Sequence, residues 1–293
     1  MERLMEQIAE FAPAGAGLGY VLLDVFTRRP LEGNPLAVFT GAAPDAALMQ
    51  RIARELNLSE SVFLSEPDAG GDLRVRIFTP SAELPFAGHP VLGTAVLAGL
   101  AQERDQVVLE TGAGAVAVRL REREGSARFG AMAQPLPSCE PWPHPAELLA
   151  ALGVGSAVLP IEVYDNGPRH TFVALGSEAE VTALAPDLGA LAEFGAVGFS
   201  CFAADGTRVR SRAFAPGLGV NEDPATGSAA GPLALHLARH GRVAWGEQVE
   251  ITQGVEIGRP STLLATASGS DERLEQVEVA GWAVIAGAGE LHV

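Results

Sequence analysis

The spacing of apolar residues along the chain predicts many short strands and few helices. Leu48, Ile52 and Leu56 lie four residues apart, which indicates an amphipathic helix over 45–56. Further helices are expected over 89–100, 146–152, 187–194 and from about 227 to 240. Strands are expected over 20–26, 36–39, 61–64, 73–78, 107–110, 115–121, 158–163, 171–175, 197–202, 209–214, 249–251 and 277–285. Because strands outnumber helices, the pattern favours an α+β fold over a doubly wound parallel sheet.

One phrase occurs twice within this pattern. It reads R-x-F-x-P, then a loop, then [HD]-P-x-x-G-[ST]-A and an apolar run, first over 76–95 and again over 212–229. Each copy is expected to form a strand, a turn and the start of a helix. His89 in the first copy stands where the second has Asp223. A duplicated scaffold with different polar residues predicts two half-sites that meet at one cleft.

Pro232 limits where the second of these helices begins. A helix that began at Asp223 would carry Pro232 more than two turns in, where the proline ring would break it. A start near Gly227 brings Pro232 close to the first turn, where its missing N–H matters least. Asp223 is therefore expected in the loop before the helix, and Ser228 in its first turn. In the first copy, Pro90 is expected near the first helical position.

The length of 293 residues favours two domains. A proline-rich stretch over 134–145 indicates the crossing between them. We therefore expect one half over 1–128 and a second over 129–293, with the final strand a candidate to return to the first half. Residues 1–17 are expected to form an extension, with a Gly/Ala-rich hinge at 14–19.

Charge and cysteine content narrow the functional classes. With 20 basic and 36 acidic residues the net charge is −16, which argues against nucleic acid and anionic membranes as partners. The N-terminus lacks a signal-peptide core, and the longest apolar helical run is too short to span a bilayer. Cys139 and Cys201 form neither a metal motif nor a disulfide framework, which suits a reducing cytoplasm. We expect both to be buried and without a chemical role.

The two helix starts are the first candidates for a binding site. Their unbonded N–H groups and dipoles would favour a carboxylate. Gly88 and Gly227 would let a ligand approach the backbone closely, while His89, Asp223 and Ser228 would supply polar contacts. Plain helix capping explains the same residues equally well in either copy taken alone.

Two weaker signals predict no cofactor. His236 and His240 lie four residues apart on the second helix, but the sequence shows no HExxH glutamate and no third ligand. We therefore expect both to face solvent and expect no metal. The glycine-rich segment 15–19 precedes a strand rather than following one, so it is not a dinucleotide-binding loop.

Several segments resemble the signatures of one family. N-L-S-E-S at 57–61, E-L-P-F-A-G-H-P at 83–90 and E-D-P-A-T-G-S-A at 222–229 are similar to motifs of the PhzF family, the phenazine-biosynthesis-like proteins. G-N-P-L-A-V-F at 33–39 and G-R-P-S at 258–261 also resemble its signatures. The motifs stand in family order and cover nearly the whole chain.

This resemblance implies a fold and an activity. The fold would be that of diaminopimelate epimerase: two similar halves, each a curved, mostly antiparallel sheet around a central helix, with the site between them. The activity would be a cofactor-free isomerisation of a small carboxylate-bearing metabolite. The family's named member moves a hydrogen along the ring of trans-2,3-dihydro-3-hydroxyanthranilate. The resemblance also implies a homodimer, and the cysteine content given above places it in the cytoplasm.

The resemblance assigns roles to particular residues. The family's acid/base matches Glu60, and its substrate-holding positions match His89, Asp223 and Ser228, beside Gly88 and Gly227. Glu60 precedes an apolar strand, so its carboxyl group could lean into a dry cleft, where burial raises a carboxyl pKa toward working pH. Without the motif, a surface glutamate explains the position equally well.

Two other functions remain open on the same fold. A racemase or epimerase of an amino-acid-like substrate would need a second base, and His89 or Asp223 would have to serve. A two-thiol mechanism is disfavoured, because neither cysteine belongs to a repeated motif. A binding protein that kept the cleft and lost turnover is the third hypothesis.

Overall fold

The computed structural model describes residues 2–12, 17–41 and 43–293, which form two units. Unit 1 comprises residues 1–133 and 280–293, and unit 2 comprises residues 134–279. The division lies between residues 133 and 134 rather than 128 and 129, because the strand Ala127–Ala133 pairs with the strand before it. The expected hinge at 14–19 falls largely on residues 14–16, which lie outside the described ranges.

The strands of unit 1 pair in a closed ring. They are β1 (Leu18–Val25), β2 (Asn34–Phe39), β3 (Glu60–Ser65), β4 (Leu73–Phe78), β5 (Glu83–Leu84), β6 (Gln106–Thr111), β7 (Gly114–Glu124), β8 (Ala127–Ala133) and, from residue 280 onward, the long strand β17 (Leu274–Leu291), which begins in unit 2. The pairing runs β1, β2, β3, β4, β6, β7, β8, β17 and back to β1. The β2–β3 and β4–β6 pairs are parallel, whereas β1–β2, β3–β4, β6–β7, β7–β8 and β1–β17 are antiparallel, so the sheet is mostly antiparallel.

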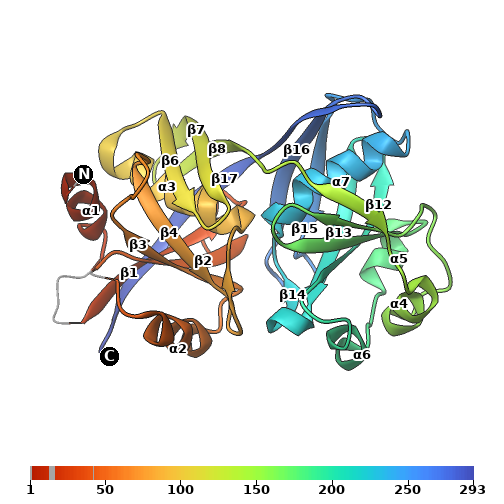
Figure 1. Cartoon of the computed structure of the whole chain (residues 1–293), viewed down its shortest axis with the longest axis horizontal. Helices are drawn as coiled ribbons and strands as arrows, with labels where there is room; N and C mark the ends of the chain where they lie inside the picture. Colours follow the sequence, from red (N-terminus) through yellow and green to blue (C-terminus); the bar gives the residue numbers. More distant parts are fainter. Residues whose placement is uncertain (1, 13–16, 42) are drawn as a thin grey trace. The chain divides into compact units, whose positions relative to one another are not determined.

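Helix α3 (Gly88–Gln102) lies inside this ring (Figure 1). Residues 88–100 are all buried, as expected for a helix that is apolar on every side. Helix α2 (Ala46–Leu56) covers the outer face, where it packs Met49 and Ile52 against strand phenylalanines. The side chain of Asp45 accepts from the N–H of Leu48 and so caps α2. The strands of unit 1 therefore surround α3, and α2 packs on the outer face of these strands.

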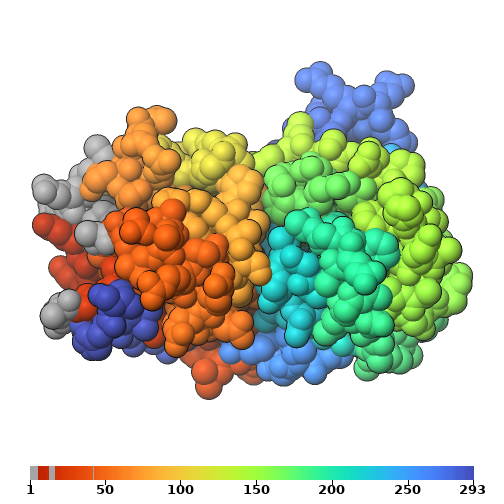
Figure 2. Space-filling view, turned by 60° about the horizontal axis from the view of Figure 1, so that its bottom comes forward, coloured from red at the N-terminus to blue at the C-terminus, as the bar shows by residue number. Residues whose placement is uncertain are grey.

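The two ends of the chain both belong to unit 1. Helix α1 (Glu2–Ala9) contacts α3, and the Gln102 side chain donates to the side chain of Gln7 at 2.9 Å. Figure 2 shows the C-terminal residues, in dark blue, at the surface beside the orange-red segment that holds α2. Leu291 packs against the apolar cluster under that helix. No helix in the described part of the chain is long and apolar enough to cross a membrane.

Unit 2 repeats the plan of unit 1. Its strands are β9 (Ser138–Pro141), β10 (Glu162–Asp165), β11 (Arg169–Ala174), β12 (Gly198–Asp205), β13 (Arg208–Ala215), β14 (Val220–Asp223), β15 (Gln248–Gln253) and β16 (Ser261–Gly269). They pair in the order β9, β10, β11, β12, β13, β15, β16, with β11–β12 and β13–β15 parallel. Helix α7 (Gly227–Arg239) is buried from residue 227 to 238. Outside the sheet lie α4 (Pro145–Leu152), α5 (Glu178–Thr182) and α6 (Leu188–Ala192), and the 3-10 turn η1 (Pro216–Leu218) follows β13.

The repeated phrase in the sequence is a repeat of architecture. In unit 1 the order is β2 and β3, which are parallel, then β4, a loop, α3 and β6, which is parallel to β4. In unit 2 the same order is β11 and β12, then β13, a loop, α7 and β15, which is parallel to β13. The expectation of two similar halves, each with a mostly antiparallel sheet around one helix, is confirmed. The strand expected over 158–163 is displaced, since β10 begins only at Glu162, after Pro160, which has no N–H for a ladder.

Pro232 lies deeper in α7 than expected, as the sixth residue rather than in the first turn. A residue with an N–H at this position would donate to the carbonyl of Ser228. The buried side chain of Asn166 donates to that carbonyl instead, at 2.9 Å. Asn166 lies in the turn between β10 and β11. The Asn166 side chain thus replaces the helical hydrogen bond that Pro232 cannot make to the carbonyl of Ser228, a candidate site residue.

We expect Asn166→Ala to lower the free energy of unfolding by about 1–3 kcal/mol, because the buried Ser228 carbonyl loses its donor. In a Pro232→Ala background the restored N–H should satisfy this carbonyl, and the loss should be smaller. Urea denaturation of the two single variants and the double variant measures this coupling. An equal loss in both backgrounds would contradict the compensation.

Candidate active site

The first half-site lies where α3 begins. Its N-cap residue, Ala87, makes no side-chain cap, so α3 starts without the capping that was the alternative explanation. His89 is the second helical residue, and Pro90 the third, where an N–H would have no helical partner in any case. Glu60 is the first residue of β3, and Asn34 the first of β2. The parallel pairing of these strands brings both beside the helix start.

His89 forms the centre of this half-site. Its Nδ1 lies 3.4 Å from Oε2 of Glu60 and 3.2 Å from Nδ2 of Asn34. Burial lowers the pKa of His89 to about 3, so the imidazole is neutral near pH 7. Because the amide nitrogen of Asn34 can only donate, Nδ1 accepts and the ring proton lies on Nε2. That Nε2 is buried and has no hydrogen-bond partner among the described residues, which leaves a donor for a ligand.

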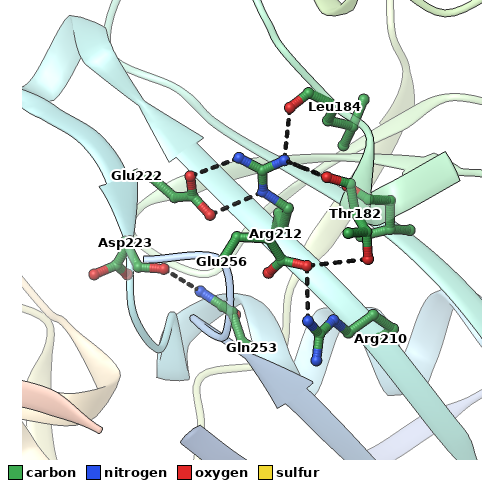
Figure 3. Close-up of polar contacts among 9 residues, drawn as sticks. Thr182, Leu184, Arg210, Arg212, Glu222, Asp223, Gln253 and Glu256 are labelled. Carbon is green, nitrogen blue, oxygen red and sulfur yellow. Dashed lines mark hydrogen bonds and ion pairs between the residues drawn. The ribbon is translucent and has the colours of Figure 1, made fainter. Parts of the chain in front are cut away.

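The second half-site is held by an arginine of the repeated phrase. Arg212 on β13 donates through Nε and Nη2 to the two carboxylate oxygens of Glu222, at 2.9 and 2.8 Å (Figure 3). Its guanidinium lies 5.1 Å from the ring centroid of Phe214 and also donates to the carbonyl of Leu184. Both charged side chains are largely buried. The pair fixes β14, which contains Glu222 and ends at Asp223. Asp223 is therefore the last residue of a short strand, whereas the sequence predicted a loop position.

Unit 1 contains the same device. Arg76 donates to Glu83 through Nε and Nη2, at 2.7 Å each, and lies 5.2 Å from the ring of Phe78. We call these two arrangements the arginine clamps. The recurrence of R-x-F in the sequence marked both arginines, but their glutamate partners lie at different distances along the chain and gave no signal. In both units the arginine of the repeated R-x-F-x-P phrase therefore holds the segment that leads to the central helix.

Asp223 is fixed by a small polar network. Its Oδ2 accepts from the hydroxyl of Thr226 at 2.7 Å. The buried side chain of Gln253 donates to the Asp223 carbonyl at 2.7 Å (Figure 3). It also donates to the Thr226 hydroxyl at 2.9 Å. Next to it, Gly254 has a φ of +77°, and a Cβ there would collide with the carbonyl oxygens of Arg259 and Pro224. The segment that carries Asp223 thus packs directly on a glycine.

Ser228 is the second residue of α7, the same helical position that His89 occupies in α3. Its Oγ lies 2.9 Å from Nε2 of His170, which is on β11. Burial lowers the pKa of His170 to about 4, so this imidazole is also neutral near pH 7. In each unit, the second strand of the hairpin, β2 or β11, therefore supplies the side chain that bonds this helical position: Asn34 to His89, and His170 to Ser228.

At one repeated position, unit 1 has a carboxyl group and unit 2 has none. In unit 1, Ser61 pairs with Phe78, and in unit 2 Phe199 pairs with Phe214, the equivalent phenylalanine of the repeated phrase. The residue before each is Glu60 in unit 1 and Gly198 in unit 2. A Cβ at Gly198 would lie 2.9 Å from Nδ1 of His170, so glycine leaves the room that His170 occupies. Unit 2 has no carboxyl group where unit 1 has Glu60.

The sequence-based site residues therefore fall into two sets. Glu60 and His89 lie together in unit 1, and Asp223 and Ser228 lie near the start of α7 in unit 2. Gly88 and Gly227 are the first residues of the two central helices, as expected. Sequence analysis missed the supporting residues Asn34, His170, Thr226 and Gln253. Asn34 and Thr226 stand inside two of the family-like motifs, but nothing in those motifs assigned them a role, and no spacing marks His170 or Gln253.

Three expectations outside these half-sites need correction. His236 and His240 do not face solvent, because His236 is fully buried and His240 contacts Glu162. Cys139 is only half-buried and lies against Arg239. Cys201 is buried as expected, and burial raises the pKa of its thiol to about 12.

Comparison with known proteins identifies the family. Residues 23–289 match the model of the PhzC-PhzF family, the phenazine biosynthesis-like proteins. The chain belongs to this family. Over 263 residues it is 53% identical to a trans-2,3-dihydro-3-hydroxyanthranilate isomerase of Pseudomonas aeruginosa, covering 89% of this chain and 95% of the relative. The protein is accordingly an isomerase of the PhzF type that acts on a small molecule.

Solved structures confirm the epimerase-like fold of this PhzF-family member. A predicted epimerase from Pseudomonas aeruginosa has a TM-score of 0.81 and 34% identity, covering 94% of this chain and 99% of that one. A hydroxyproline epimerase from Agrobacterium vitis has a TM-score of 0.66, covering 94% and 91%. At 14% identity, this second likeness concerns the fold alone.

The packing at Gly254 predicts a large difference between two glycine substitutions. Gly246 has a similar φ of +81°, but a Cβ there would meet no atom within 4 Å. Gly246→Ala should therefore lower stability by only about 1 kcal/mol, from backbone conformation. Gly254→Ala adds a collision with two carbonyl oxygens and should lower stability by at least about 2 kcal/mol more. Thermal melting of both variants tests this, and similar losses would contradict the close packing.

The buried imidazoles predict a dependence of stability on pH. The pKa values of His89 and His170 lie at about 3 and about 4, below the ordinary 6.5, so the unfolded chain takes up protons first as pH falls. Their contribution is complete above about pH 6.5 and is lost as pH falls toward 4. Between pH 7 and pH 5, Tm should fall more steeply for the wild type than for His89→Gln or His170→Gln. His144 is exposed, so His144→Gln should keep the wild-type slope. Equal slopes for the wild type, His89→Gln and His170→Gln would contradict the assignment.

Proposed function

We propose that the enzyme isomerises trans-2,3-dihydro-3-hydroxyanthranilate, with Glu60 as the group that takes and returns the proton. The observation that carries this proposal is the position of Glu60, 3.4 Å from a buried, neutral His89, in a chain that has a glycine at the equivalent position of its second unit. One carboxyl group suits a proton shift on one face of a ring. The 53% identity to an isomerase of that name supports this choice of substrate.

The proposed reaction needs no oxidant, reductant or added atom. The Glu60 carboxylate takes a proton from one ring carbon, and the electrons of that C–H bond shift through the conjugated double bonds. The resulting carboxylic acid then gives a proton to another ring carbon. Because His89 is neutral, it does not hold Glu60 in a permanent ion pair, so the carboxyl group can exist in both protonation states during turnover.

The remaining residues would hold the substrate still. The N–H of His89 Nε2 and the unbonded N–H groups at Gly88 and Gly227 suit the substrate carboxylate. Asp223 would accept from the amino group, and Ser228 would contribute its hydroxyl, both fixed by their own partners. Such fixed donors and acceptors position the reacting carbons relative to Glu60.

We further infer a cytoplasmic homodimer. The dimer rests on the family resemblance, and the two free cysteines fit a reducing compartment. Light scattering on the purified chain should give twice the mass of one chain, and a monomer would contradict this part of the proposal.

The decisive experiment follows conversion of the substrate by NMR in heavy water. Glu60→Gln keeps the size of the side chain but cannot accept the proton, so kcat should fall by about 100- to 10,000-fold while KM changes little. The matched control is Glu66→Gln, an exposed glutamate just after the same strand, which should retain wild-type turnover. Wild-type turnover by Glu60→Gln would overturn the role of Glu60. A wild-type enzyme that leaves this compound unchanged, but exchanges protons of another small carboxylate only when Glu60 is present, would overturn the substrate alone.

A further inference from the structure

A second cluster of titratable side chains lies at the other end of α7. Oε2 of Glu162, on β10, lies 3.1 Å from Nδ1 of His236 and 3.0 Å from Nε2 of His240. Both histidines belong to the end of the helix, and their spacing of four residues places them on one face. The three atoms all lie within 4.8 Å of one another. The topology thus provides the third ligand that the sequence did not reveal.

Oε2 of Glu162 has more polar neighbours than it can accept hydrogen bonds from. Besides the two imidazoles, the hydroxyl of Tyr164 lies 2.9 Å and Nη1 of Arg239 lies 3.4 Å from the same Oε2. Four polar neighbours therefore surround one oxygen, which has about two lone pairs to offer. A cation bound to Oε2 would instead use the ring nitrogens as ligands and remove this competition.

A candidate fourth ligand lies on the neighbouring strand, outside the group of three atoms that lie within 4.8 Å of one another. Cys139 of β9 is the register partner of Tyr164, and its Sγ lies 2.6 Å from Nη1 of Arg239. The same Nη1 is 2.8 Å from the Tyr164 hydroxyl. A positive group already sits against Sγ and Oε2. Because the Arg239 side chain is 35% exposed, it can turn into solvent when another cation arrives.

We propose that Glu162, His236 and His240 bind one divalent transition-metal ion of the zinc class, and that the Cys139 side chain turns in as the fourth ligand when Arg239 moves out. Two imidazoles, a thiolate and a carboxylate are donors that zinc accepts, whereas magnesium and calcium favour oxygen ligands alone. Zinc bonds of about 2.0–2.2 Å to nitrogen and oxygen give ligand separations of about 3.3 Å in a tetrahedron. The separations of 3.0 and 3.1 Å need to open by only a few tenths of an ångström.

The bound metal would join two strands to the central helix of unit 2. Ser228 lies eight residues before His236 on α7, so the metal would lie about 12 Å along the helix axis from the candidate active site. At that distance the ion would stabilise the helix without touching substrate. The metal site is therefore independent of the proposed isomerisation.

The test uses the full-length, tag-free chain after removal of metals with a chelator. Zinc should bind at one equivalent per chain and raise Tm. Cobalt should give the visible bands of a tetrahedral ion together with a thiolate-to-cobalt charge-transfer band. Cys139→Ser should abolish the charge-transfer band, and His240→Ala should weaken zinc binding on the order of 100-fold. Both altered residues are partly exposed, and circular dichroism without metal confirms that the variants are folded.

Two further variants separate a metal site from a hydrogen-bond network. Arg239→Ala removes the competing cation and should bind zinc at least as tightly as the wild type. His144→Ala, an exposed histidine in the same unit, should leave affinity unchanged. Failure of the wild type to bind zinc, equal affinity of His240→Ala, or a cobalt spectrum that does not change in Cys139→Ser would each overturn the proposal. None of these measurements depends on turnover.

Discussion

Each unit is organised around the burial of an apolar helix inside its own sheet. Residues 88–100 of α3 and 227–238 of α7 are buried, so neither helix has a solvent-facing side. Burial in this way removes apolar surface from water along the whole helix, but it also carries the unbonded N–H groups of the first turn into the protein. Those groups and the second helical residue then become the polar part of an otherwise apolar interior. The candidate half-sites follow from this single constraint.

The polar groups around the helix starts are held by side chains from the sheet. The arginine clamps fix the loop before each helix, and Asn34 and His170 fix the second helical residue. A buried ion pair such as Arg212–Glu222 adds little net stability, but removal of one partner leaves an unpaired buried charge. These networks therefore act mainly by restricting the loops to one conformation. A site for a small substrate needs that restriction, because reacting groups must stay within tenths of an ångström of their positions.

The hydrophobic pattern predicted both central helices, because a buried helix is apolar on every side. The position of Ser228 followed from Pro232, and the repeat from a recurring motif. The short helices α1 and α5 were not predicted. Glu60 was recognised only through the family motif, since one glutamate before a strand has no periodic signature. Strand β16 was missed because its buried positions, such as Ser261, Ala265 and Ala267, are mostly small residues. The cluster of Glu162 with His236 and His240 was also missed. It depends on strand β10 lying against a helix that follows more than 60 residues later.

The ring of unit 1 has a consequence for the way the protein is made. Its strands β1 and β8 are joined by β17, which is the last strand of the chain. During synthesis, unit 1 begins first but cannot close until the residues of β17 have left the ribosome. Until then β1 and β8 each present an unpaired edge, the kind of surface on which strands from other chains can add. Unit 2, although translated later, needs no segment from outside residues 134–279 and can complete its own core first.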